Sequence, residues 1–595
     1  MVSTVDLLLA STPLLLAGAL LVVALWPATR AMPFAWLVAL GVGAFVWGMP
    51  PEYLAAASLV GTMTAIQILW IVFGALLLLY TLMEAGAFDR INEGFAAVSE
   101  DRRIQIVLVG FFLATFIEGA AGFGTPAAVV APLLLALGFP ALAAVVVALI
   151  GHVVAVTYGA VGTPIVIGIA EPIGSVSSIR ATIEAEGLTA AEFAVAVARW
   201  AATYHALVGV FMPFAAVAVL VYFFGPDGNR SIAPAIAVWP LCLFAGVSFV
   251  VPYWLAAWYL SPEVPALMGS IVGGVVVVTA VRAGYFDPDD EWDFAPEESW
   301  PDHWLGSIRP RDARGVIAER NAMSPIHAWT PYMLLIALLT MTRGIDPLAA
   351  LLQGERVTLF GTDVSLPFAT IATGAGEFTV GLAGIEWASI LGTGIGNGID
   401  VLYLPGTWLL VSALVAVPLF GMSRGQVADA WREAGRNTGA PLVALAFVLA
   451  MAHVMLQSGS HPNAPDAGSM IVVLATSTAA VFGPAYPFFA AFIGALGAAL
   501  VGSNTVSNIT FGPLQFVAAE NLGISRELTV AAQTVGGAIG NLVAIHNVVA
   551  ALATVGLVGE EGRVVRLTLL PLIGYLFLVG LLSVCFVYVL FPGTF

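Results

Sequence analysis

A hydrophobic stretch interrupted by glycines constrains the fold of this chain most. Residues 111–139 read FFLATFIEGAAGFGTPAAVVAPLLLALGF, so two apolar runs flank the segment EGAAGFGTP. Each run is too short to cross a bilayer, which takes about 20 apolar residues in one helix. Irregular backbone at membrane depth persists only where protein or a water-filled cavity satisfies its polar groups. The pattern therefore predicts a re-entrant hairpin, and such broken segments mark the binding sites of transporters.

The composition of the whole chain is that of a polytopic membrane protein. Of its 595 residues, 60% are hydrophobic and 10% are charged, and the mean hydropathy is +0.98. No polar segment is long enough to form a soluble domain with its own core, so we expect an all-α, multi-pass protein of the plasma membrane. We expect the first apolar segment to be a retained helix rather than a signal peptide. Uninterrupted spans are predicted near residues 7–26, 33–48, 62–83, 193–223, 232–251, 265–281, 328–342, 402–420, 439–456, 467–482 and 566–591.

The charge balance is strongly acidic. Lys and Arg together number 20, all of them Arg, against 37 Asp and Glu, which gives a net charge of −17. A solvated acidic surface without lysine is typical of proteins adapted to high salt and predicts a halophilic source, with a halophilic archaeon as the expectation. The same excess of acid argues against nucleic acid as a partner.

Two compound regions, 104–172 and 484–558, share one order of elements. Each reads as a short helix, a polar break, a second short helix, a turn and a glycine-broken helix. A shift of 385 positions places Glu118-Gly119-Ala120 on Ser503-Asn504-Thr505. This order predicts two inverted repeats with re-entrant hairpins, which is the usual architecture of secondary transporters. The expected divisions are a first transmembrane half at 1–283, an acidic polar loop at 284–326 and a second transmembrane half at 327–595.

Other segments carry weaker signals. The stretch 365–400 is also broken and is predicted to hold a further half-helix, whereas the polar segments 172–192 and 284–326 are expected to be solvated loops or surface helices. Arginines cluster after the first and third predicted spans, and the preference of arginine for the cytoplasmic side places the N-terminus outside.

Glu118 is the leading functional candidate because ionisable residues within membrane segments are rare. Its alternative role is to cap the following half-helix. His152 lies in a second apolar segment and could relay protons, although a hydrogen-bonded packing histidine is the more common role for it, as for His205 and His546.

The second break offers dipoles instead of charge. Ser503, Asn504, Thr505, Ser507 and Asn508 cluster in GSNTVSN. Hydroxyls, amides and the exposed N–H groups of a half-helix N-terminus could hold a small carboxylate, and unwound carbonyls could coordinate a cation. The alternative is that these residues only pack helices together. The remaining histidines show no ligand spacing, so no metal site is expected, and no cofactor motif is evident.

At these residues the chain resembles the lactate permease family. The resemblance rests on FIEGAAGFGTPAAVVAPLLLALGF, VGTPIV, HAWTPYMLLIALL, GSNTVSN and QTVGGAIGNLVAIHNVVAALATVGLVGEEG, which together cover nearly the whole chain in order. The family implies a transport site at residues 118–124 and 503–508. The substrate-contacting residues expected there are Gly119, Ala120, Gly122, Gly124, Thr125, Ser503, Asn504, Thr505, Ser507 and Asn508.

The resemblance implies import of L-lactate, with D-lactate or glycolate as further substrates, by proton symport. Glu118 and His152 are then the proton-coupling candidates. A more distant resemblance to sodium–dicarboxylate symporters, which present Ser-Asn-Thr at a hairpin tip, makes sodium coupling the first alternative. A membrane-embedded enzyme or respiratory subunit is the alternative from another class, but it requires a nucleophile–base pair, paired haem histidines or a metal triad, and the sequence shows none.

Overall fold

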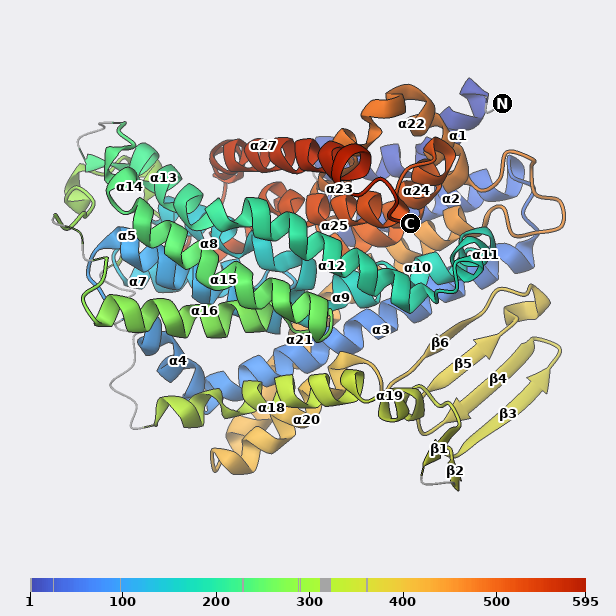
Figure 1. Ribbon diagram of the computed structural model, residues 1–595, viewed down its shortest axis with the longest axis horizontal. Helices are drawn as coiled ribbons and strands as arrows, with labels where there is room; N and C mark the ends of the chain where they lie inside the picture. The colour runs from blue at the N-terminus through green and yellow to red at the C-terminus, as the bar shows by residue number, and fades with distance from the viewer. Residues whose placement is uncertain are drawn as a thin grey trace.

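Long helices that run side by side build most of the molecule. The computed structural model describes residues 3–24, 26–96, 98–226, 230–286, 288, 290–310, 323–359 and 362–595. Within these residues, 11 helices are long and apolar enough to cross a membrane, or up to 13 if each of two bent helix pairs counts as one span. The helices lie roughly parallel, and a small sheet projects at one end (Figure 1). The predicted helical, multi-pass architecture with broken helices is confirmed.

Several helices of the first half begin where the sequence places a capping side chain or a proline. Ser3 and Thr189 form capping boxes with Asp6 and Glu192, for example. The helices of this half are α1 (Thr4–Gly18), α2 (Ala28–Phe45), α3 (Pro51–Glu84), α4 (Ala87–Ala96), α5 (Arg102–Gln105), α6 (Ala114–Ala120), α7 (Thr125–Ala136), α8 (Ala141–His152), α9 (Gly159–Val166), α10 (Ala170–Ser175), α11 (Ser177–Ala185), α12 (Ala190–Val208), α13 (Met212–Phe224), α14 (Ala233–Ala237), α15 (Trp239–Tyr259) and α16 (Pro265–Arg282).

The second half is helical apart from the sheet. Its longest helix follows a capping box of Ser423 with Gln426. The helices of this half are α18 (Pro325–Gly344), α19 (Asp346–Leu352), α20 (Pro405–Leu419), α21 (Arg424–Gln457), α22 (Met470–Phe482), α23 (Tyr486–Val501), α24 (Asn504–Leu522), α25 (Arg526–Gly540), α26 (Ile545–Thr554) and α27 (Glu561–Cys585).

The expectation of a half-helix within 365–400 was wrong, because this segment forms strands. An antiparallel hairpin precedes a four-stranded antiparallel sheet in the order β3-β4-β5-β6. Alternating Thr, Ile and Val residues favour strands, and the frequent glycines disfavour a helix. The strands are β1 (Val357–Leu359), β2 (Thr362–Val364), β3 (Phe368–Thr373), β4 (Gly376–Gly381), β5 (Ile385–Ala388) and β6 (Asn397–Ile399).

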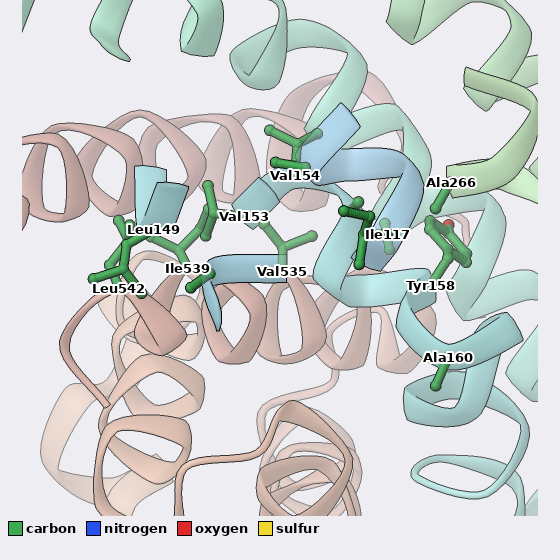
Figure 2. Packing of buried hydrophobic residues seen from close by; sticks show 14 of the residues in the cluster. Ile117, Leu149, Val153, Val154, Tyr158, Ala160, Ala266, Val535, Ile539 and Leu542 are labelled. Atoms are coloured by element: carbon green, nitrogen blue, oxygen red, sulfur yellow. The ribbon is translucent and has the colours of Figure 1, made fainter. Parts of the chain in front are cut away.

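The two compound regions of the sequence form the interior of the molecule. A π-helical turn at Ile106–Leu113 joins α5 to α6 into one span, and the most apolar windows of this span and of Ala141–Ser175 are 100% buried. Protein rather than lipid therefore surrounds these two spans of the first compound region. Figure 2 shows Ile117 of α6 near Val153 and Val154, which face Val535 and Ile539 of α25.

The two hairpins enter the interior from opposite ends of the molecule. The α6–α7 hairpin opens beside α14, where Arg103 of α5 donates to the Pro234 carbonyl at 3.0 Å. The α23–α24 hairpin opens beside α11 at the other end, where Thr182 donates to the Glu520 carboxylate at 3.1 Å (Figure 1). This is the arrangement that two inverted repeats predict.

Part of the acidic segment between the halves is pinned to the membrane helices. The backbone N–H of Trp292 donates to Asp101 at 3.0 Å, and that of Ser307 donates to the Gly556 carbonyl at 2.8 Å. Residues 290–308 therefore lie as a strap across the ends of α5 and α26, and most of their side chains remain open to solvent.

Candidate functional site

The tips of the two hairpins meet at one pocket in the interior. Its volume is about 390 Å³, counted with the space that is open to solvent. The tips of the α6–α7 and α23–α24 hairpins contribute to its wall. So do two broken helices, of which the first is α8 with α9 and the second is α25 with α26. The lining residues are Glu118, Gly122, Phe123, Gly124, His152, Val156, Gly159, Ala160, Pro164, Gly502, Ser503, Asn504, Thr505, Asn541 and Asn547.

The first tip is a left-handed turn between α6 and α7. Gly122, Phe123 and Gly124 have φ values of +59°, +51° and +78°. Glycine adopts such values without strain, whereas a phenylalanine there is unusual. A Cβ atom at Gly124 would lie 2.6 Å from Oδ1 of Asn547, so this glycine also permits the close approach of the second broken helix.

Glu118 lies in the last turn of α6 with its carboxylate inside the protein. The residue is only 4% exposed, and its Oε2 lies 3.9 Å from Nε2 of His152. Nδ1 of His152 lies 2.7 Å from the Ala148 carbonyl, which can only accept, so Nδ1 carries the proton. In the neutral ring, Nε2 is therefore an acceptor that faces the Glu118 carboxyl group. Glu118 and His152 are the ionisable side chains among the described residues of the pocket wall.

The first broken helix passes behind Glu118. Ala160, Val161 and Gly162 all have positive φ values, so α9 begins with a left-handed turn at the level of the pocket. The hydroxyl of Thr163 donates to the Ala160 carbonyl at 2.6 Å and satisfies one of the groups that the break leaves free. A Cβ atom at Gly162 would lie 2.4 Å from the Pro262 carbonyl oxygen, which shows how closely the loop before α16 covers this turn.

The second tip is a tighter turn between α23 and α24. Gly502 has a φ of +71°, and the His546 ring lies so close that a Cβ atom at Gly502 would overlap it. Ser503 caps α24, with its hydroxyl accepting from the Val506 N–H at 3.4 Å. The first turn of α24 thus begins at the pocket, as does that of α7, in which Pro126 has no N–H and the Thr125 N–H donates to the Gly122 carbonyl at 3.0 Å. Helix N-termini of this kind attract anions.

Behind the second tip, amide side chains join the two halves of the protein. Asn508 donates from Nδ2 to the Pro164 carbonyl at 2.9 Å and to the Thr534 hydroxyl at 2.7 Å. Asn504 approaches the same hydroxyl at 3.5 Å. Ser507 donates to the Gly494 carbonyl at 2.9 Å. Asn508 and Ser507 are fully buried and do not line the pocket, so their contacts hold α24 against α9, α23 and α25.

The second broken helix completes the wall. Asn541 follows α25 and donates to the Gly537 carbonyl at 3.0 Å, and Asn547 of α26 donates to Asn541 at 3.0 Å. These side chains bridge the break between α25 and α26, whose helix axes differ by 43° in direction.

The structure brings together part of the predicted site. The predicted residues that line the pocket are Glu118, Gly122, Gly124, His152, Ser503, Asn504 and Thr505. Those that do not are Gly119, Ala120, Thr125, Ser507 and Asn508. Gly119 instead packs on α16, since a Cβ atom there would lie 2.9 Å from the Cβ of Ala266. Asn541 and Asn547 were not predicted as site residues, although their glycine-broken segment GGAIGNLVAIHN signalled an irregular helix.

Two further groups bear on the chemistry that the site could support. His205 is hydrogen-bonded through both ring nitrogens, as expected of a packing histidine. Among the described residues, no three His, Cys, Asp or Glu side chains are placed to hold a metal ion. The pocket therefore offers two helix N-termini, amide and hydroxyl dipoles, one carboxyl group and one imidazole. This set can bind a small anion and exchange a proton beside it.

Comparison with known proteins gives one family and several relatives. The family model described as L-lactate permease matches residues 6–590. A putative L-lactate permease of Haemophilus influenzae is 29% identical over 533 residues, which cover 87% of each chain. The glycolate permease GlcA of Escherichia coli is 27% identical over 92% of this chain and 90% of its own. Among solved structures, the YdaH transporter of Alcanivorax borkumensis aligns over 94% of this chain and 98% of its own, at 14% identity and a TM-score of 0.41.

Proposed function

The chain belongs to the L-lactate permease family, and on that premise we propose that it imports L-lactate together with a proton through the pocket between the two hairpin tips. Permeases are transporters, so the alternative of a membrane-embedded enzyme is set aside. Lactate and glycolate, the substrates named for the relatives, share a carboxylate and a 2-hydroxyl group. This chain is accordingly a transporter of lactate or glycolate, and D-lactate is a further expected substrate.

The substrate carboxylate is proposed to bind where the N-termini of α7 and α24 converge. Two helix N-termini supply partial positive charge without a full cation, and the first turn of α24 adds N–H groups. Gly122, Gly124, Ser503 and Thr505 lie at this point of the wall. The missing side chains of the glycines let the anion approach the backbone, and Asn504 and Thr505 add polar side chains.

The need for coupling follows from charge. Lactate is an anion near neutral pH, and a membrane potential that is negative inside opposes its entry by about 2.3 kcal/mol per 100 mV. One proton carried with it cancels this electrical work and lets a pH gradient drive uptake. The carrier then needs a group beside the anion that gains and loses a proton.

Glu118 is proposed as that group, and the single observation that carries this assignment is its buried carboxylate on the pocket wall. A carboxyl group removed from water is less costly to bury in its neutral, protonated form, and a bound anion beside it adds to this preference. His152 is proposed as the partner that exchanges the proton with Glu118, because its Nε2 faces the carboxylate at 3.9 Å.

The test is uptake of labelled L-lactate by purified protein in liposomes, with pH and sodium gradients imposed separately. Proton symport predicts accumulation under an inward proton gradient in sodium-free buffer, and alkalinisation of a weakly buffered exterior on addition of lactate. A sodium gradient alone should then drive no accumulation. Accumulation that requires sodium and ignores the pH gradient would replace protons by sodium as the coupling ion, and absence of any lactate transport would refute the proposed function.

A further inference from the structure

A 3-10 turn lies directly between two residues of the pocket wall. It comprises Val153–Tyr158 and joins His152, at the end of α8, to Gly159, at the start of α9. Such turns rarely exceed three or four residues because their hydrogen bonds are poorly aligned. This turn has six and is fully buried, so side chains from other helices must stabilise it.

Three hydrogen bonds tie this turn to α12 and α15. The hydroxyl of Tyr253 on α15 donates to the Val154 carbonyl at 2.9 Å. The turn's own Tyr158 donates to the Ala198 carbonyl of α12. Thr157 is bonded to Nε2 of His205, also on α12, at 2.8 Å. Figure 2 labels Val153, Val154 and Tyr158 of this turn together with Ile117 of α6.

His205 extends this support to the last helix. Its Nδ1 lies 2.6 Å from the hydroxyl of Tyr575 on α27, and the histidine is completely buried. A neutral imidazole donates through one nitrogen and accepts through the other, so both hydroxyls are matched without a charge. The groups that face His205 are Thr157, Tyr253 and Tyr575, and none of them is charged at neutral pH.

We propose that His205, with Thr157 and Tyr575, is a positioning residue for the proton-exchanging pair: it fixes the 3-10 turn and so sets the distance between Glu118, His152 and Gly159. This inference rests on the proposed function. The chain of bonds runs from α27 through α12 to the turn, and the turn carries His152 at one end and Gly159 at the other. Gly159 in turn contacts Glu118, since a Cβ atom there would overlap the carboxylate.

The perturbation is His205→Leu, which keeps the volume but removes both hydrogen bonds. A displacement of about 1 Å at a reacting centre costs roughly a hundredfold in rate. We therefore expect lactate uptake driven by a pH gradient to fall about ten- to a hundredfold. The pH at which uptake is half-maximal should shift, because the surroundings of Glu118 and His152 change. His205→Gln, whose amide can donate and accept, should restore most of the rate and the original midpoint.

His453→Leu is the matched control. His453 is a buried histidine of another membrane helix, and neither of its ring nitrogens has a partner among the described residues. Its replacement should leave the midpoint of the pH profile unchanged. In a double-mutant cycle measured by lactate exchange, His205→Leu should have little further effect in the Glu118→Gln background, since the group that it positions is then absent.

The outcomes separate this inference from the proposed function. If the parent protein accumulates lactate with protons but His205→Leu, present in the membrane at the parent level, keeps both rate and pH midpoint, the positioning role is refuted. A lower melting temperature with an unchanged midpoint would refute it too, because it would show structural support alone. If the parent accumulates no lactate under a proton gradient, the failure belongs to the proposed function. Tyr575→Phe and Thr157→Val each remove one bond, and each should shift the midpoint in the same direction as His205→Leu.

Discussion

Gly159→Ala tests whether Glu118 occupies the place that the structure gives it. The added Cβ atom would lie 2.2 Å from Oε1 of Glu118. Carbon and oxygen atoms that are not bonded approach to about 3.3 Å, so the carboxylate must move by about 1 Å. The backbone at Gly159 has a φ of −62° and a ψ of 154°, which alanine adopts without strain. The substitution therefore acts through the carboxylate alone.

This displacement should lower both the stability of the protein and its rate of lactate uptake. Overpacking of a buried position costs about 1–3 kcal/mol of stability, which leaves most of the protein folded. A shift of about 1 Å in a proton-exchanging group should lower pH-driven lactate uptake about a hundredfold. The measurement is the initial rate of labelled lactate uptake in proteoliposomes at matched protein content, together with the melting temperature.

The controls make this prediction refutable. Gly41→Ala introduces a methyl group with no heavy atom within 4 Å, so uptake should stay at the parent rate. Adding Glu118→Asp to Gly159→Ala shortens the acid by one methylene and should recover part of the uptake. Parent-level uptake by Gly159→Ala would show that the carboxylate is not held beside Gly159, and the reasoning about the pocket wall would fail.

Three further predictions concern other parts of the structure. Arg343→Gln breaks a buried ion pair, in which Nε of Arg343 lies 2.6 Å from Oε1 of Glu263, and should lower the free energy of unfolding by about 3–5 kcal/mol. Arg180→Gln breaks the exposed pair with Glu184 and should lower it by at most about 1 kcal/mol, as measured by thermal unfolding. The pKa of Asp400, outside the membrane spans, is raised to about 6 by desolvation and by the Glu386 and Glu355 carboxylates, so the stability that it contributes is lost as the pH rises through about 6. Asp400→Asn should thus be more stable than the parent protein above pH 6, by less than about 1 kcal/mol because solvent screens the carboxylate, and a stability difference between variant and parent that is the same at pH 4 and pH 8 would contradict this. Ser503→Ala, Asn504→Ala and Thr505→Ala should each raise the lactate dissociation constant roughly two- to tenfold, by loss of one neutral hydrogen bond, and unchanged binding in all three would make these residues packing contacts.

The sequence predicted the irregular parts of the interior well because their chemistry is unusual at membrane depth. A carboxylate, glycines and a Ser-Asn-Thr run inside apolar stretches are costly there unless they surround a cavity. This is why Glu118, Gly124, Ser503 and Thr505 could be expected at one pocket before their positions were known.

The remaining features depend on tertiary contacts that local patterns do not encode. Ser507 and Asn508 share the motif of Asn504, but the twist of α24 turns them towards Gly494 and Pro164, away from the pocket. Asn547 reaches the wall because α26 bends away from the direction of α25 and packs against α7. The sheet was missed because its glycines were interpreted as a helix break, whereas they lie among strand-forming residues that pair with one another.

The most direct test of proton coupling at the pocket compares two modes of transport in Glu118→Gln. The glutamine has the shape of the protonated acid but cannot release a proton. We predict that this variant loses accumulation of labelled L-lactate under an imposed pH gradient and retains exchange of internal for external lactate. Full pH-driven accumulation by Glu118→Gln would contradict the assignment of Glu118 and, with it, the central claim that lactate and proton meet at this pocket.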